Sequence, residues 1–384
     1  MKQRRRLLAV GHQYVIGPYR RLPLEIAKIA HDWDVTIAPP VFWHGHPRFG
    51  DFRAVTLEPT PEEESLLRPV RMHFTQRIHV AMYGMDMHRV LASNWDVVHC
   101  WQEPFVFAGG QVALWKRSET KLVFSSFQNI AKKYPPPFSL IERFALQRSA
   151  AWVANGESVM QTLEAKSFYR SRPHERIWPG VDTTAFRPDA ARRSKVISNL
   201  GWADDGAPIV GFLGRFVPSK GVQLLMNALD HVATPWRAVF VGGGEMEASM
   251  REWSTRYGDR VRIVTGVSHE AVPAQLNAFD LICAPSQTTP KWREQFGRML
   301  VEAFASGVPV IASDSGEIPY VIGEAGLVVG EHDLAGWVSA IERLLADPNL
   351  REDLGQRGLE RANATFAWPK VASRYVDFFE SIIG

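Results

Sequence analysis

The chain has 384 residues, of which 46% are apolar and 22% are charged, and its formal net charge is +3. This composition is typical of a globular protein and excludes a disordered, collagen-like or low-complexity chain, and the length suits two domains of ordinary size. No apolar run approaches the ~20 residues that a helix needs to cross a bilayer.

The first half predicts short strands separated by helices. The apolar stretch 7–10 breaks at Gly11, so we interpret it as a first strand and not as part of a signal peptide. Further strands are expected at 35–38, 97–100, 122–124 and 152–154. Glu103 follows the strand 97–100, and we therefore expect it at the ligand edge of the sheet.

Residues of the metal-binding types give no convincing metal site. The Asp-Trp-Asp triplet at 32–34 precedes a strand and so lies at the end away from ligands. His44 and His46 are too few to hold a metal without further ligands. Cys100 and Cys283 each lie in a strand-like apolar run, which predicts buried free thiols in a reducing cytoplasm.

Two aromatic segments of the first half have two interpretations. Residues 42–46 and 134–138 combine Phe, Trp or Tyr with His or Pro. They either form an apolar surface for an acceptor or pack as ordinary loops.

The second half alternates strands and helices clearly, after a linker expected near 181–206. Its strands are expected at 209–213, 238–241, 261–264, 281–284 and 308–312, and the tail 347–384 is expected to be helical. Short apolar strands alternating with helices predict a doubly wound parallel sheet covered on both faces. Ligands of such sheets bind at the carboxyl ends of the strands, where Gly214, the glycines 242–244, Gly266 and Ser286 fall.

Arg215 and Lys220 stand in the pattern Gly-Arg-x4-Lys-Gly at 214–221, which joins a strand to a helix. Arginine offers a fork of donors and lysine a point charge, so both can converge on one diphosphate. They would neutralise a leaving diphosphate without a metal. The alternative is that both are surface cations.

Glu294 and Glu302 flank Gly297 at the expected start of a helix that runs from Arg298 to Ala305. A helix start offers free N–H groups and a positive dipole end to a phosphate, and glycine permits close approach. Glu302 is then placed to take a ribose diol and Glu294 the hydroxyls of a sugar. Two surface glutamates on a solvated helix are the alternative.

Taken together, these motifs resemble the family 4 glycosyltransferases of GT-B fold. The resemblance rests on Gly-Arg-x4-Lys-Gly, the glycine turn at 242–244, Glu-x7-Glu at 294–302 and Gly-Val-Pro-Val-Ile-Ala-Ser at 307–313. The segment 178–188 resembles that family's interdomain segment. The match is specific over residues 170–384 and looser before them.

The resemblance implies two Rossmann-like domains facing a cleft, with a C-terminal helix crossing back to the first. The expected bounds are 1–188 for the acceptor-side domain, 189–365 for the nucleotide-sugar domain and 366–384 for the helix.

The resemblance also implies an activity: retaining, metal-independent transfer of a sugar from a UDP-, GDP- or other nucleoside-diphosphate sugar. The acceptor would be a hydroxyl of a glycan, a glycolipid or a small molecule, and no nucleic acid is expected as a partner. Arg215 and Lys220 would bind the diphosphate, helped by the amides of Met299 and Leu300. Residues 265–267, with Gly266 and Val267, would line the base, and pocket shape near Phe296 would help select the donor.

One position departs from the family pattern. Many members have a histidine in the first domain near the reacting carbon, where this chain has Gln128 as the nearest equivalent. Glutamine can donate or accept a hydrogen bond but cannot titrate. In the retaining mechanism usually proposed for the family, a phosphate oxygen of the donor takes the acceptor proton. The alternative is that Gln128 is only a polar loop residue.

The charge is unevenly distributed along the chain. Residues 1–188 contain 25 Lys and Arg against 17 Asp and Glu, a balance of +8, and the remainder has 19 against 24, a balance of −5. This predicts an anionic partner for the first half, such as an acidic acceptor or the inner face of the plasma membrane, for a cytoplasmic protein. Uneven surface charge without a partner is the alternative. Candidate contacts are Arg4, Arg5, Arg6, Arg20, Arg21, Lys132 and Lys133.

Two other functions are compatible with a sugar-nucleotide site of this kind. One is a GT-B sugar-nucleotide epimerase, which would act without an acceptor. The other is a binder of sugar nucleotides without catalysis.

Overall fold

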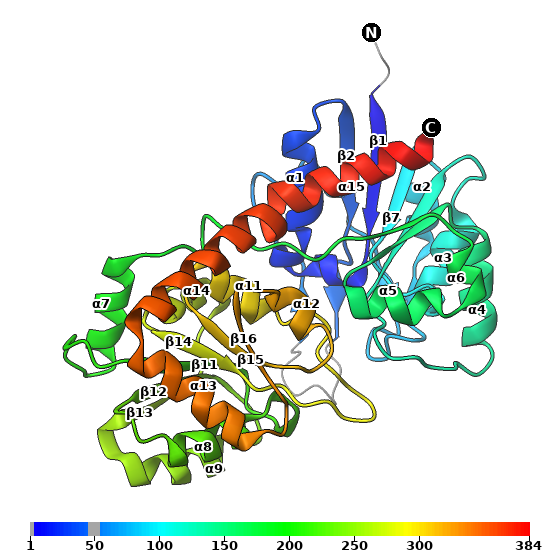
Figure 1. The fold of residues 1–384 in the computed structure, drawn as a ribbon. Coiled ribbons are helices and arrows are strands. Elements are labelled where there is room, and N and C mark those ends of the chain that lie inside the picture. Colours follow the sequence, from blue (N-terminus) through cyan, green and yellow to red (C-terminus); the bar gives the residue numbers. More distant parts are fainter. Residues whose placement is uncertain (1–3, 45–53) are drawn as a thin grey trace. The chain divides into compact units, whose positions relative to one another are not determined.

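The computed structural model describes residues 4–44 and 54–384, and it divides into two units (Figure 1). The first unit contains Met1–Pro179 and Trp368–Gly384, and the second contains Gly180–Ala367. Residues 180–188, which the sequence assigns to the first domain, therefore group with the second unit.

The first unit is built on a parallel sheet with the order β10-β9-β8-β7-β1-β2. Its strands are β1 (Arg5–Val10), β2 (Trp33–Ala38), β7 (Val97–Cys100), β8 (Lys121–Ser126), β9 (Ala151–Ala154) and β10 (His174–Arg176). Short antiparallel pairs join β3 (Phe42–Trp43) to β4 (Val55–Thr56), and β5 (Met72–His73) to β6 (Met82–Tyr83). Every residue of β7 and β9 is buried, which is why these strands read as continuous apolar runs.

Helices cover both faces of the first sheet. They are η1 (His12–Val15), η2 (Gly17–Arg20), α1 (Arg21–Ile29), α2 (Met85–Leu91), α3 (Phe107–Trp115), α4 (Phe138–Gln147), α5 (Glu157–Glu164) and α6 (Ser167–Arg170). The edge strand β10 was absent from the predicted strands because its sequence, His-Glu-Arg, is polar.

The C-terminal helix α15 (Trp368–Ile383) belongs to the first unit, as the resemblance predicts, and lies beside α1 in Figure 1. Its apolar face, with Tyr375 and Phe379, packs in one cluster with Trp33 and Val97 of the sheet. Buried polar contacts tie it to the same sheet, because the Ser125 hydroxyl lies 3.2 Å from the Tyr375 hydroxyl.

The second unit repeats the architecture with the strand order β13-β12-β11-β14-β15-β16, again parallel. Its strands are β11 (Ile209–Arg215), β12 (Arg237–Gly243), β13 (Val261–Val264), β14 (Leu281–Ala284), β15 (Val310–Ser313) and β16 (Gly326–Val329). Its helices are α7 (Ala190–Asn199), η4 (Pro218–Lys220), α8 (Val222–His231), α9 (Glu247–Ser254), η5 (Thr255–Arg260), η6 (His269–Ala271), α10 (Val272–Asn277), α11 (Arg298–Ala305), α12 (Ile318–Ile322), α13 (Leu334–Ala346), α14 (Pro348–Arg361) and the π-helical η7 (Ala362–Phe366). The predicted doubly wound parallel architecture is thereby confirmed.

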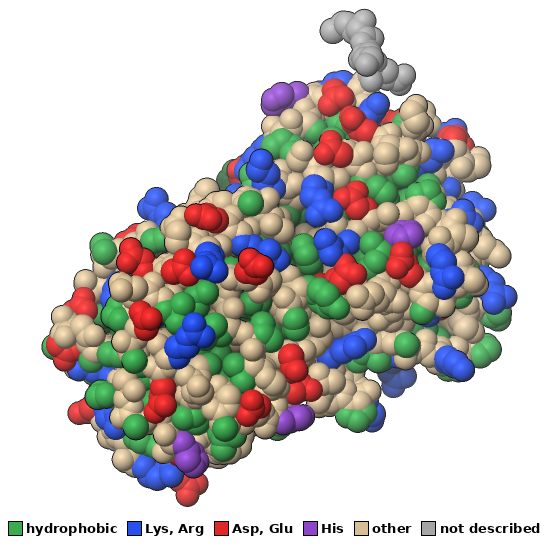
Figure 2. All heavy atoms as spheres, viewed as in Figure 1, with side chains coloured by type: hydrophobic (Ala, Val, Ile, Leu, Met, Phe, Trp, Pro, Cys, Tyr) green, Lys and Arg blue, Asp and Glu red, His purple; other side chains and the backbone are tan. Residues whose placement is uncertain are grey.

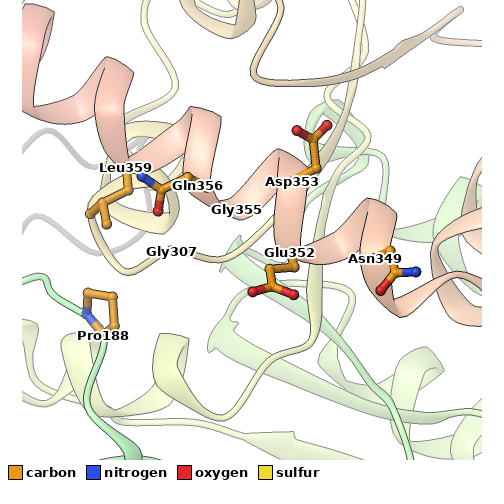
Figure 3. A pocket seen from close by; sticks show the side chains of 8 residues that line it. All are labelled: Pro188, Gly307, Asn349, Glu352, Asp353, Gly355, Gln356 and Leu359. Atoms are coloured by element: carbon orange, nitrogen blue, oxygen red, sulfur yellow. The ribbon is translucent and has the colours of Figure 1, made fainter.

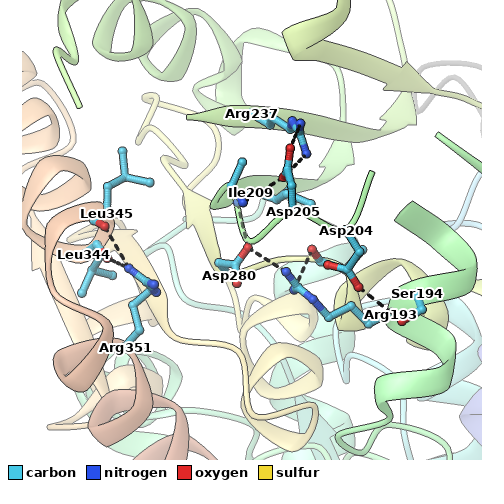
Figure 4. Close-up of polar contacts among 12 residues, drawn as sticks. Arg193, Ser194, Asp204, Asp205, Ile209, Arg237, Asp280, Leu344, Leu345 and Arg351 are labelled. Atoms are coloured by element: carbon cyan, nitrogen blue, oxygen red, sulfur yellow. Dashed lines mark hydrogen bonds and ion pairs between the residues drawn. The ribbon is translucent and has the colours of Figure 1, made fainter. Parts of the chain in front are cut away.

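Charged side chains fix the amino-terminal end of the second sheet, opposite to its ligand edge (Figure 4). The Asp280 carboxylate accepts the Ile209 N–H at 2.8 Å at the start of β11 and pairs with Arg193 of α7 at 3.2 Å. The linking segment is therefore anchored where it enters the sheet.

Positive and negative side chains are interspersed over the face drawn in Figure 2. Within the described residues, none of the helices combines the length and the apolar character needed to cross a bilayer.

Candidate functional site

The carboxyl end of β11 carries the two predicted diphosphate ligands. Arg215 is the last residue of β11, and Lys220 ends the short η4 turn that follows. Gly221 comes next with φ 69°, and a Cβ there would lie 1.7 Å from the Pro285 carbonyl oxygen. Only glycine therefore allows this loop to lie against the exit of β14.

The Arg215 guanidinium is half-buried, and within the described residues it makes no hydrogen bond or ion pair. An unpaired guanidinium at the ligand end of a parallel strand is suited to an incoming anion.

Lys220 and Glu294, 74 residues apart in the sequence, form an ion pair. The same Glu294 oxygen accepts the Ser286 hydroxyl at 3.0 Å, and the Lys220 ammonium lies 4.9 Å from the centroid of the Trp292 ring. Glu294 is 9% exposed. The sequence analysis predicted none of these contacts: it placed Lys220 with Arg215 on a diphosphate and did not consider Trp292.

Gly297 caps α11 with φ 75° and ψ 60°, the left-handed conformation that glycine favours. The predicted helix start is thus in place. The Leu300 N–H, however, already donates to the Gly297 carbonyl at 2.8 Å. It could assist a phosphate only by sharing its hydrogen between that carbonyl and a phosphate oxygen. The Glu294 segment is held against the start of α12, because the Glu317 N–H donates to the Glu294 carbonyl at 3.0 Å.

Glu302 lies within α11 and is 7% exposed. Its carboxylate pairs with Arg298 at 3.4 Å, and the same guanidinium lies 3.4 Å from His269 Nε2. His269 was missed by sequence reasoning, because a single histidine in a short turn gives no signal. Phe296 is 4% exposed and packs 6.0 Å from Phe366.

The neighbouring strand ends are shaped by glycines. A Cβ on Gly242 would lie 1.8 Å from the Gly214 carbonyl oxygen, so the ends of β11 and β12 approach closely. Gly266, after β13, has φ 72° and no atom within 4 Å of an added Cβ, and Val267 is half-buried beside it. This leaves the predicted base-lining turn open on its outer side.

Gln128 and Glu103 lie in the first unit and are connected. The Glu103 carboxylate accepts the Ser126 hydroxyl at 2.7 Å and the Phe127 N–H at 2.8 Å. The Ser126 hydroxyl in turn accepts the Gln128 N–H at 3.1 Å. Burial raises the pKa of Glu103 to about 7. Glu103 thus supports the loop that carries Gln128.

The Gln128 side chain is 6% exposed. Its amide Nε2 lies 3.4 Å from the Ile130 carbonyl, whereas Oε1 is buried without a partner among the described residues. The geometry leaves Oε1 as the atom that can accept a further hydrogen bond.

The two aromatic segments of the first unit are partly used in packing. Tyr134 stacks on Phe105 at 4.0 Å, which matches the loop-packing alternative for 134–138. Trp43 lies 4.7 Å from the His12 ring, and the His44 Nδ1 lies 2.9 Å from the Thr75 hydroxyl. His46 lies outside the described residues.

Groups of three or more His, Cys, Asp or Glu that could hold a metal ion do not occur in the described ranges 4–44 and 54–384. Asp34 of the predicted non-metal triplet pairs with Arg4 at 2.8 Å. Cys100 and Cys283 are free and buried, and burial raises the pKa of both thiols.

A cavity of about 540 Å³ lies elsewhere on the second unit (Figure 3). It is lined by α14, Pro188 and Gly307, and it contains none of the predicted site residues.

Comparison with known proteins agrees with the resemblance. Residues 200–361 match the family model of the glycosyl transferases, group 1. The chain is 32% identical over 223 residues to a GDP-mannose-dependent alpha-(1-6)-phosphatidylinositol monomannoside mannosyltransferase of Mycobacterium tuberculosis. That alignment covers 56% of this chain and 57% of the relative, so the chain spans little more than half of that protein's length.

A longer alignment relates the chain to a D-inositol 3-phosphate glycosyltransferase of Corynebacterium kroppenstedtii, with 25% identity over 352 residues, 87% of this chain and 75% of that protein. Among solved structures, Anabaena HepE in complex with UDP superposes with a TM-score of 0.72 at 18% identity, covering 98% of this chain and 100% of that one. At this identity the likeness shows the fold, and the predicted GT-B class is confirmed.

Proposed function

We propose that this chain, whose second unit belongs to the group 1 glycosyl transferases, moves a sugar from a nucleoside-diphosphate sugar to a hydroxyl acceptor. The acceptor is a glycan, a glycolipid or a small molecule, the reaction retains the anomeric configuration, and no metal takes part. The observation that carries the proposal is the unpaired Arg215 guanidinium at the end of β11, beside the Lys220–Glu294 pair.

Each role follows from the chemistry of the site. Arg215 and Lys220 bind and neutralise the diphosphate, with help from the Met299 amide at the start of α11. Glu302 accepts hydrogen bonds from the ribose diol, and the open turn at Gly266 receives the base. Glu294, already oriented by Ser286 at 3.0 Å, accepts a hydroxyl of the donor sugar.

In the proposed reaction the bond between the anomeric carbon and the diphosphate oxygen breaks, and a bond to the acceptor oxygen forms on the same face. The acceptor proton passes to the leaving diphosphate oxygen. Gln128 can hold a hydroxyl through its unpaired Oε1 but takes no proton, because an amide does not titrate.

The similar proteins differ in the nucleobase of the nucleotide that their names or titles print. The mannosyltransferase of Mycobacterium tuberculosis is named as GDP-mannose-dependent, and the Anabaena structure contains UDP. We therefore propose a GDP- or UDP-sugar as the donor.

We also propose a cytoplasmic location with contact at an anionic membrane, through a surface narrower than the sequence suggested. Arg20 is 1% exposed and pairs with Glu63 at 2.8 Å, so it is removed from the candidate contacts. Lys132 and Lys133 are exposed, and α4 beyond them exposes the apolar Leu140 at 64%. Cations beside exposed apolar groups suit an acidic lipid surface.

The test uses the purified chain and a panel of UDP- and GDP-sugars. One of them should raise the melting temperature, because a ligand at ~100 times its Kd adds about 2.7 kcal/mol of stability. The same donor should be hydrolysed slowly without acceptor, and turnover should persist in EDTA. Binding without hydrolysis or transfer would indicate a binder, epimerisation of the donor would indicate an epimerase, and loss of turnover in EDTA would contradict metal independence.

A further inference from the structure

The loop 287–292 comes shortly after β14 and is hydrogen-bonded to the η4 turn, which ends at Lys220. The Gln287 N–H donates to the carbonyl of Ser219, the residue before Lys220, at 2.9 Å. The Gln287 side-chain amide donates to the Glu331 carbonyl, beyond the end of β16, at 3.1 Å. The loop and the turn are therefore held in a fixed relation to each other.

The far end of this loop closes on itself. The Thr289 N–H donates to the Trp292 carbonyl at 2.7 Å, and the Trp292 N–H donates to the Thr289 carbonyl at 3.2 Å. The Thr288 hydroxyl lies 2.9 Å from the Ser315 hydroxyl, which joins the loop to the segment after β15. These contacts fix the backbone from which the half-buried Trp292 side chain extends.

The Trp292 ring contacts the Lys220 ammonium without using its N–H groups as hydrogen-bond donors. The ammonium lies 4.9 Å from the ring centroid, within the ~6 Å over which the face of an aromatic ring attracts a cation. A lysine ammonium has three N–H donors, and among the described residues Glu294 is the one hydrogen-bond acceptor of Lys220. The other donors therefore remain for phosphate oxygens.

Glu294 by itself is a poor anchor for this ammonium during the proposed reaction. The carboxylate oxygen that pairs with Lys220 also accepts the Ser286 hydroxyl at 3.0 Å, and Glu294 is the residue assigned to the donor sugar. Lysine has a long, flexible stem, so an ammonium held by Glu294 alone would move with that carboxylate. The Trp292 ring gives the ammonium a second support that does not depend on Glu294.

We propose that Trp292 is a positioning residue, which holds the Lys220 ammonium toward the phosphate next to the donor sugar. The proposal rests on the proposed transferase function and adds a residue to its diphosphate site. Lys220 serves that phosphate because it lies beside Glu294, the residue assigned to the sugar. Trp292 therefore affects the binding of a nucleoside diphosphate and not that of the monophosphate, which lacks this second phosphate.

The experiment measures the binding of UDP, GDP, UMP and GMP to the full chain by calorimetry. Trp292→Leu and Trp292→Met remove the ring, whereas Trp292→Phe keeps an aromatic face. The matched control is Trp115→Leu, because Trp115 is also half-buried but lies in the first unit, where its ring centroid is 5.5 Å from that of His88. The same Trp292 substitutions are also made in a Lys220→Ala background.

Both substitutions that remove the ring should weaken the better-binding diphosphate about 10-fold, while Trp292→Phe and the control stay within ~3-fold of the wild-type chain. Binding of the corresponding monophosphate should not change. In the Lys220→Ala background the same substitutions should have no further effect, because a residue that acts through Lys220 loses its role when Lys220 is removed.

Three results would overturn the role of Trp292 and leave the proposed function standing. They are equal weakening of monophosphate and diphosphate, an undiminished effect in the Lys220→Ala background, and wild-type diphosphate binding by both variants that lack the ring. If neither UDP nor GDP binds the wild-type chain, the proposed function fails and the role of Trp292 fails with it.

Discussion

Arg215 and Lys220 occupy similar places in the sequence but different electrostatic settings. Arg215 has no described partner, whereas Lys220 pairs with Glu294, whose side chain is 12% exposed. Arg215→Ala and Lys220→Ala should each slow turnover by at least ~10²-fold, because each removes a preorganised charge from the leaving diphosphate.

The two substitutions should differ in stability. Lys220→Ala leaves the Glu294 carboxylate in place without its cation, so it should lower the melting temperature more than Arg215→Ala does. Arg357→Ala, on the surface of α14, serves as the control and should affect neither quantity. Near-normal turnover in both site variants, with folding intact, would contradict the diphosphate assignment.

Glu302 and Glu294 are expected to act on different parts of the donor. Glu302→Gln should weaken binding of the bare nucleoside diphosphate by about 10-fold, because an amide accepts hydrogen bonds from a diol less well than a carboxylate. Glu294→Gln should leave that affinity nearly unchanged and lower kcat, because its partner is the reacting sugar. Calorimetry with the diphosphate and steady-state kinetics measure the two effects, and the reverse pattern would show that the roles are exchanged.

Glu103 gives the first unit a pH-dependent stability. Its folded pKa of about 7 lies above its ordinary value of 4.5, so its contribution to stability is fully present below pH ~4.5 and is lost as pH rises through 7. Glu142 raises this pKa further, and Lys166 opposes it. Glu103→Gln should reduce the fall of the unfolding free energy with rising pH. The slope of that fall from this one group is at most about 1.4 kcal/mol per pH unit. Urea unfolding of the wild-type chain and the variant at pH 5, 6, 7 and 8 measures this slope. The same slope in both would show that Glu103 contributes nothing.

At the scale of elements, α15 shows how a distant segment completes a sheet. Phe379 is fully buried in the cluster that contains Trp33 and Val97. Phe379→Ala should cost about 3–5 kcal/mol, because the cavity left behind collapses only partly. Hydrogen exchange should accelerate in β7 and stay unchanged in β11 of the other unit. Asp377→Ala, exposed on the same helix, is the control, and a loss below about 1 kcal/mol for Phe379→Ala would show that the contact is dispensable.

At the scale of the whole molecule, ion pairs within the chain neutralise part of the +8 charge of residues 1–188. Arg4 pairs with Asp34, Arg5 with Glu380 and Arg21 with Glu25. Lys132 and Lys133 remain exposed, next to α4. We therefore expect the chain to sediment with vesicles containing acidic lipid more than with neutral ones, and less so as salt rises from ~50 to ~500 mM.

The double substitution Lys132→Glu and Lys133→Glu should abolish most of this sedimentation. Lys195→Glu combined with Arg343→Glu makes the same change of charge on the second unit and should leave it intact. Equal sedimentation with acidic and neutral vesicles would leave a dissolved acceptor as the better proposal.

The sequence alone determined the two parallel sheets, the residues at their ligand ends and the start of α11. These features depend on short windows, because buried parallel strands appear as apolar runs, and Gly297 marks a local change of backbone direction. The half-buried edge strands β10 and β16 escaped prediction, since their residues are polar or only partly covered.

The tertiary structure decided which of these residues meet. It pairs Lys220 with Glu294, uses Glu103 to hold the Gln128 loop, and buries Arg20 against Glu63. It also brings the loops after β1, β7 and β8 together, although about 90 residues separate the first two, as the Gln13–Trp101 hydrogen bond shows. Such partnerships depend on strand order and packing between remote segments, and no local pattern of residues encodes them.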